Sequence, residues 1–109
     1  MNYSVKSLPT FDKNLKYLAK KYPSLKTEFI DLVKILKENP LEGKALGNNC
    51  YKIRIAIASK GKGKSGGARI ITNFVISADT IYLLTIYDKA DKKNLTDKEL
   101  KELLIEVPA

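Results

Sequence analysis

The sequence predicts an α+β domain of two layers, in which an antiparallel sheet carries a pair of helices on one face. Apolar residues recur at helical spacing between residues 11 and 36, and then at every second position between residues 50 and 87. A break at Tyr22-Pro23-Ser24 divides the helical part, so its two halves must fold back on each other. Since 109 residues suffice for one core but not for two, we expect residues 1–109 to form a single domain.

The first half of the chain is expected to hold an edge strand and two helices. Residues 2–6 fit a short edge strand, and Pro9-Thr10 offers a cap for the first helix. Apolar residues at helical spacing then define two buried faces, one with Phe11, Leu15, Leu18, Ala19 and Tyr22, the next with Leu25, Phe29, Leu32, Val33 and Leu36. Asn39-Pro40 ends the second helix, and residues 41–49 are expected to form a loop.

Three antiparallel strands are expected in the second half, over residues 50–58, 68–76 and 81–87. Lys52 and Arg54 alternate with isoleucines in the first strand, so they share a face, and Arg69 opens the second. The third strand is apolar on both sides and should be central. Strict alternation turns Tyr82, Leu84 and Ile86 toward the helices and Leu83, Thr85 and Tyr87 away from them.

A short helix is expected at the end of the chain. Thr96-Asp97-Lys98-Glu99 is a capping-box pattern, and Leu100, Leu103 and Leu104 follow as an apolar stripe. The sheet face opposite the helical pair is expected to remain partly open. We expect it to carry a polar cluster of Lys52, Arg54, Arg69 and Tyr87.

Residues 59–69 form a basic, glycine-rich loop between two of these strands. The loop threads three lysines and one arginine through four glycines, an arrangement that suits close approach to a polyanion. A solvated connector is the alternative for this loop. The loop does not match a phosphate-binding P-loop, because Ala58 stands where that motif needs glycine and a strand pattern follows Ser65.

The composition favours an anionic partner. Lys+Arg 20 against Asp+Glu 12 gives a net charge of +8, which suits a nucleic acid, an anionic membrane surface or an acidic protein. Without a long apolar segment or a signal-peptide pattern, we expect a soluble, cytoplasmic protein. A membrane is not among the expected partners. The single cysteine, Cys50, is expected to be buried. Because histidine is absent, proton transfer would fall to Lys, Tyr, Asp or Glu. No carboxylate pair suggests a metal site, and no cofactor is expected.

Three segments resemble the RelE/HigB-type toxins of bacterial type II toxin–antitoxin modules. They are Tyr51-Lys52-Ile53-Arg54, residues 59–69 with Ile70-Ile71, and residues 82–89. The 59–69 run is most similar to the HigB-like branch. The resemblance covers nearly the whole chain. It implies a fold of the microbial ribonuclease-like kind, cleavage of mRNA in the ribosomal A site, and neutralisation by a cognate antitoxin.

The resemblance also assigns roles to individual residues. Lys52 and Arg54 stand where the family has two basic residues on one strand, Arg69 where it has an arginine opening the next, and Lys89 at a basic position after the last strand. Ala90 replaces a further catalytic arginine, and no tyrosine follows between residues 92 and 97. Either Tyr87 and Lys89 take those roles, or the chemistry is weaker or different.

The function expected from these residues is a ribosome-dependent endoribonuclease that needs no metal. Lys52 is the candidate base and Arg69 the phosphate clamp, with Arg54 assisting and Tyr87 orienting the substrate or donating a proton. The loop cations Lys60, Lys62 and Lys64 are expected to grip rRNA or the mRNA backbone. Two alternatives stay open: a non-nucleolytic toxin that inhibits DNA gyrase, as the ParE branch does, and a passive RNA-binding module.

Overall fold

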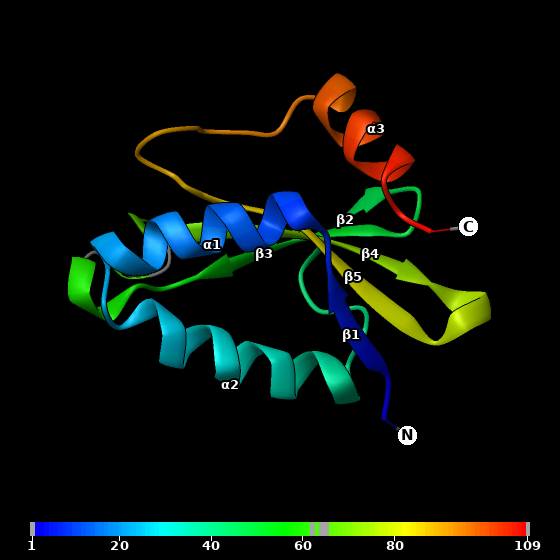
Figure 1. Cartoon of the computed structure of the whole chain (residues 1–109), viewed down its shortest axis with the longest axis horizontal. Coiled ribbons are helices and arrows are strands. Elements are labelled where there is room, and N and C mark those ends of the chain that lie inside the picture. The colour runs from blue at the N-terminus through cyan, green and yellow to red at the C-terminus, as the bar shows by residue number, and fades with distance from the viewer. Residues whose placement is uncertain (1, 62, 64–65, 109) are drawn as a thin grey trace.

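The structure is a computed structural model that describes residues 2–61, 63 and 66–108 (Figure 1). Its helices and strands follow the predicted order with one additional strand. None of the described helices is both long enough and apolar enough to cross a membrane. The elements are β1 (Ser4–Ser7), α1 (Pro9–Lys21), α2 (Leu25–Glu38), β2 (Lys44–Gly47), β3 (Cys50–Ile55), β4 (Ala68–Val75), β5 (Thr80–Asp88) and α3 (Asp97–Ile105).

The strands form one five-stranded sheet in the order β1-β5-β4-β3-β2. The pairs β2–β3, β3–β4 and β4–β5 are antiparallel, whereas β1 and β5 pair in parallel. The predicted edge strand is therefore confirmed, but the sheet is mixed rather than wholly antiparallel. A parallel pair needs a long connection, and here the chain runs through both helices and three strands between β1 and β5.

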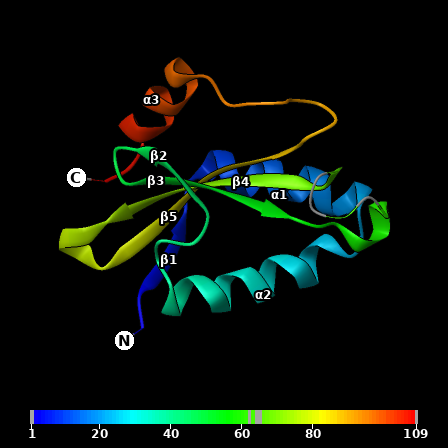
Figure 2. The ribbon, with the colours of Figure 1, turned by 180° about the vertical axis from the view of Figure 1, so that it is seen from behind.

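Helices cover both faces of the sheet, but unequally. The predicted hairpin of α1 and α2 packs on one face, where Phe11 and Phe29 hold the two helices together with ring centroids 5.4 Å apart. The shorter α3 packs on the other face through Leu100, and Figure 2 shows α2 and α3 on opposite sides of the strands. The capping box of α3 is confirmed, since Thr96 Oγ1 accepts a hydrogen bond from the Glu99 N–H at 3.1 Å.

The predicted loop at residues 41–49 is wrong in part, because it contains strand β2. β2 and β3 form a hairpin whose turn residues, Asn48 and Asn49, both have positive φ, 53° and 59°. Two such residues in succession make the tight turn that matches the twist of paired strands, and asparagine tolerates this conformation well. The pairing places Lys44 of β2 opposite Lys52 of β3.

The predicted alternation along β5 fails because the strand contains a bulge. Ile71 pairs with Thr85 but its neighbour Thr72 pairs with Leu83, which leaves Leu84 as an extra residue. The bulge reverses which positions face the helical hairpin. As a result Leu83, predicted to face away, lies with Ile86 in the hairpin-facing core, whereas Leu84 and Tyr82, predicted to face the hairpin, pack on the α3 side.

Candidate functional site

Strand register brings three of the predicted site residues into a row across the sheet. Arg54 of β3 lies directly opposite Arg69 of β4, and Arg69 lies directly opposite Tyr87 of β5. Residues directly opposite each other in antiparallel strands project from the same face. Lys52 precedes Arg54 by two positions and shares that face. The four residues predicted to form a polar cluster are therefore on one surface.

Lys52 lies in an environment that disfavours its charged form. Its pKa is lowered from the ordinary value, first by partial burial and then by repulsion from the surrounding cations. The cations that contribute are Lys44, Arg54, Arg69 and Lys89. Lys44 was missed by the sequence analysis because its strand was predicted to be a loop; the Asn48-Asn49 pair was the signal that could have revealed the hairpin.

Arg69 is almost completely buried in the row. Only 3% of its surface is exposed, and its Nη1 donates a hydrogen bond to the Ala68 carbonyl at 3.1 Å. Burial, and then repulsion from Arg54, lowers its pKa, while Tyr87 opposes the shift. The backbone approaches closely just before it, because a Cβ on Gly67 would lie 2.0 Å from the Ile55 carbonyl oxygen. Glycine at 67 thus lets β4 begin tight against the end of β3.

Tyr87 contributes a buried hydroxyl group beside Arg69. The residue is 9% exposed, and its hydroxyl oxygen has no hydrogen-bond partner of good geometry within the described part of the chain. Burial raises the pKa of Tyr87, although Arg69 and the nearby Leu95 N–H act in the opposite direction. At neutral pH the phenol therefore keeps its proton and can donate it.

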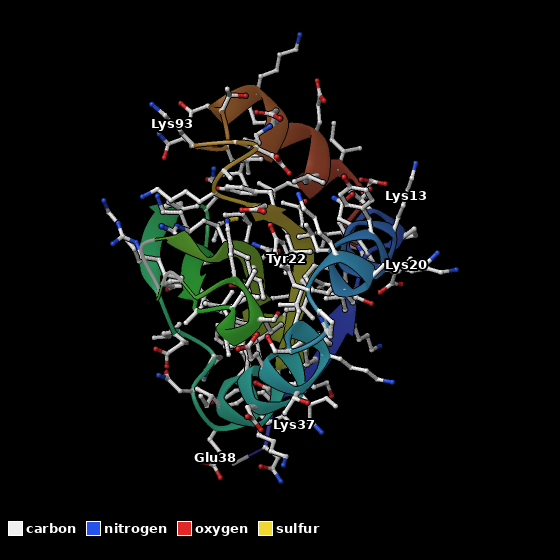
Figure 3. All side chains as sticks on the ribbon, turned by 90° about the vertical axis from the view of Figure 1, so that its left-hand side faces the viewer. Lys13, Lys20, Tyr22, Lys37, Glu38 and Lys93 are labelled. Atoms are coloured by element: carbon white, nitrogen blue, oxygen red, sulfur yellow. The ribbon has the colours of Figure 1, made fainter. Side chains whose placement is uncertain are left out.

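The basic loop begins at a buried ion pair that the sequence did not predict. Asp88 is the last residue of β5 and is 1% exposed. Its carboxylate pairs with the Lys60 ammonium and accepts hydrogen bonds from the Tyr22 hydroxyl at 2.7 Å and the Ala90 N–H at 3.0 Å. Figure 3 shows Tyr22 pointing inward, whereas Lys13 and Lys20 project from the surface.

A second set of contacts attaches the start of this loop to the helical hairpin. The Ser59 N–H donates to Ser24 Oγ at 2.9 Å, and the Ala58 N–H donates to Glu28 Oε2 at 2.7 Å. Lys60, predicted to contact RNA, forms an ion pair with Asp88 in this structure. Lys62 and Lys64, the other two predicted loop contacts, lie outside the described residues.

Lys89 continues from the end of β5 along the same region. Its backbone N–H donates to the Gly67 carbonyl at 3.1 Å, and its side chain is exposed. The charge of Lys89 is close enough to Lys52 to contribute to the lowered pKa of that residue. The arrangement as a whole combines a base candidate, several fixed cations and a protonated phenol on one face. Such a surface can bind a phosphodiester and stabilise added negative charge on it.

Comparison with known proteins identifies relatives of this fold. A family described as the RelE toxin of the RelE/RelB toxin–antitoxin system matches residues 11–106. Among solved structures, a free mutant form of E. coli toxin RelE superposes with a TM-score of 0.66 at 14% identity, covering 99% of this chain and 100% of that one. A chain of the RelBE2 toxin–antitoxin complex from Mycobacterium tuberculosis gives 0.58 at 20% identity, covering 84% and 95%. A chain of the intact E. coli RelBE complex gives 0.55 at 20%, covering 79% and 95%.

Proposed function

The chain belongs to the RelE toxin family, and we propose on that premise that it is the toxin of a type II toxin–antitoxin system that cleaves mRNA in the ribosomal A site. The observation that carries this proposal is the row of Arg54, Arg69 and Tyr87 with Lys52 beside it. Cleavage through the RNA 2′-OH requires removal of one proton, stabilisation of a dianionic phosphorane and protonation of the 5′-oxygen. Each requirement has a candidate in this cluster.

Lys52 is proposed to remove the proton from the 2′-OH. A lysine can act as a base only when it is neutral, and its lowered pKa increases the neutral fraction at a given pH. A bound RNA phosphate brings negative charge that raises the pKa of Lys52, but the surrounding cations neutralise part of that charge. Lys52 is therefore the cation of the cluster best suited to this step, since the arginines keep their protons at all working pH values.

Arg69 is proposed to clamp the scissile phosphate, with Arg54 and Lys89 assisting. A fixed guanidinium that is already desolvated needs little reorganisation when charge develops on the phosphate, which makes it an effective stabiliser of the phosphorane. Tyr87 is proposed to orient the substrate or to donate a proton to the departing 5′-oxygen. The buried hydroxyl, which finds no good partner among the described residues, supports this role. No step in this scheme calls for a metal ion or a cofactor.

RNA binding outside the row is assigned to the basic loop, with Lys60, Lys62 and Lys64 as predicted contacts. Since the Lys60 ammonium neutralises Asp88, we expect Lys62 and Lys64 to contribute more to the grip on RNA than Lys60 does. We also propose that the chain falls in the HigB-like branch, because its 59–69 run is most similar to that branch. A cytoplasmic location follows from action on ribosomes and remains part of the proposal.

A cognate antitoxin is the proposed protein partner. Two of the matched structures are toxin–antitoxin complexes, and the net charge of +8 suits an acidic, partly disordered partner segment that folds on binding. We expect co-expression with such an antitoxin to relieve growth arrest.

Primer extension on a defined mRNA, with and without translating ribosomes, tests the proposed activity. Cuts within codons that require both the protein and ribosomes are expected. Arg69→Ala should slow cleavage by roughly 100-fold or more, as loss of a transition-state charge partner typically does. Lys34→Ala on the exposed side of α2 is the matched control. Full cleavage by Arg69→Ala would contradict the clamp. Growth arrest without cuts would point to a gyrase-type target, and neither effect would leave a passive RNA-binding module.

A further inference from the structure

A groove lies next to the catalytic row, at the place where β5 loses its outer neighbour. β1 pairs with β5 only as far as Leu83, so the edge of β5 beyond that point is covered by α1 instead. There the Asn14 amide donates a hydrogen bond to Thr85 Oγ1 at 3.0 Å. Cavities of 380 Å³ and 240 Å³ lie along this edge, and Asn14, Tyr87 and Lys92 line both of them. The two cavities are therefore neighbouring parts of one groove.

The electrostatic character of this groove differs from that of the sheet face. Three glutamates line the larger cavity: Glu99 and Glu102 of α3, and Glu106 directly after its end. Lys92 is the cation among its lining residues, and it is paired with Glu99. Such a wall repels phosphate but offers acceptors to neutral N–H donors. The groove is thus unsuited to the RNA backbone and better suited to a base.

An exposed aromatic ring borders the smaller cavity. Tyr17 of α1 lines that cavity and is 64% exposed. Four lysines of the same chain segment surround Tyr17. Lys16 is its direct neighbour, and Lys13, Lys20 and Lys21 are three or four positions away; all four are exposed. Lysines around an aromatic platform are the usual combination in proteins that hold single-stranded nucleic acid.

A buried polar group also faces this groove. Tyr87 lines both cavities, and its buried hydroxyl has no hydrogen-bond partner of good geometry among the described residues. Adjacent strands are about 4.8 Å apart, so the groove begins roughly 5 to 10 Å from the position of Arg69 on β4. That separation is comparable with the distance between a phosphate and the base of the same or the next nucleotide.

We propose that this groove binds a nucleobase adjacent to the scissile phosphate, with Tyr17 as the stacking platform and Asn14 and the three lining glutamates facing the base edge. The inference rests on the proposed function, because it takes the RNA held by Arg69 as the substrate. It adds a base subsite to the phosphate site on the sheet. It also gives Tyr17 a role in substrate affinity, which the sequence analysis did not predict.

The test uses single-turnover cleavage on ribosomes programmed with a defined mRNA, at increasing protein concentrations. Tyr17→Ala is expected to raise the concentration for half-maximal cleavage by roughly 5-fold to 100-fold, the usual effect of losing one base–aromatic stack. The rate at saturation should change less than that concentration does. Tyr17→Phe keeps the ring and should recover most of the loss. Ile76→Ala, which removes a side chain of similar exposure at the β4–β5 turn, is the control for surface truncation.

Abasic mRNAs separate base stacking from other effects. The base on each side of the cut is removed in turn, and at one of the two positions the wild-type protein and Tyr17→Ala should become equivalent. A penalty that persists with both abasic mRNAs would overturn the proposal in favour of a direct contact between Tyr17 and the ribosome. Unchanged half-saturation in Tyr17→Ala would also overturn it while leaving the nuclease intact. Absence of wild-type cleavage would overturn the proposed function itself, and the base subsite with it.

Discussion

Replacing Asp88 with asparagine is expected to destabilise the fold by about 3 kcal/mol, a magnitude typical of breaking a buried ion pair. The Asp88 side chain is fully buried, and the Lys60 side chain it neutralises is 10% exposed. Asparagine can still accept one hydrogen bond, from Tyr22 or Ala90, but it leaves the Lys60 ammonium without a counter-charge. The uncompensated charge, rather than the lost hydrogen bonds, should supply most of the loss.

Urea unfolding measures this effect directly. With an m value of about 2 kcal/mol/M for a domain of this size, the midpoint should fall by roughly 1.5 M. Asp91→Asn, an exposed neighbour three positions away, is the matched control and should shift the midpoint by less than about 0.3 M. The double variant Asp88→Asn/Lys60→Met should recover part of the loss, because it removes the buried charge that the single variant leaves without a counter-charge.

The pH dependence gives an independent check of the same ion pair. Burial by itself raises the pKa of Asp88, but the hydrogen bonds from Lys60, Tyr22 and the Ala90 N–H outweigh it, and the net pKa is lower than usual. A carboxylate with a lowered pKa adds stability above its unfolded value, about 3.9, and loses that contribution as the pH falls through its folded value. The gap between wild type and Asp88→Asn should therefore be constant near neutrality and shrink below about pH 4. A gap no larger than that of Asp91→Asn at neutral pH would refute the reasoning.

Three further predictions concern the site and its supports. In a pH–rate profile, cleavage should rise with pH as Lys52 loses its proton below the ordinary lysine pKa of 10.5. Lys52→Arg cannot become neutral, so it should lose roughly 100-fold in rate and also this pH dependence. The pKa of Glu99 is lowered from 4.5 to about 2, first by its hydrogen bond from Lys92, so its contribution to stability should be complete above about pH 4.5 and disappear as the pH falls to about 2. The difference in thermal midpoint from Glu99→Gln measures this contribution. Gly67→Ala should cost about 1 to 3 kcal/mol in urea unfolding, because its Cβ would lie 2.0 Å from the Ile55 carbonyl oxygen; an unchanged midpoint would show that the strands separate easily there.

Much of the fold could be predicted because its signals are local in the chain. The two helices, the Tyr22-Pro23-Ser24 break and the capping box at Thr96 depend on residues within a few positions of each other, and each was confirmed. β2 escaped prediction although its turn signal, Asn48-Asn49, is also local. β2 has four residues, the last of them a glycine, and only weak alternation, so it does not look like a strand until its partner strand is known.

The candidate site divides in the same way. Residue type and period-two spacing indicated that Lys52 and Arg54 share a face, because side chains alternate along any single strand. That Arg69 and Tyr87 complete a row with Arg54 depends on register between strands, which the structure supplies. The bulge at Leu84 was not visible in the sequence, and it reverses the faces of the first half of β5 while leaving Tyr87 on the predicted side.

The sequence by itself determined the net charge, the order of the three helices and of every strand except β2, and the residue types available for chemistry without histidine. Only the tertiary structure decided which charges are used within the fold and which remain for a substrate. Lys60 and Asp88 are 28 residues apart in the chain and form a buried ion pair. Lys52 instead has a lowered pKa, first because it is partly buried and then because like charges surround it. Local patterns cannot distinguish these two lysines, because burial and charge pairing depend on which distant segments the folded chain brings within a few ångströms of each other.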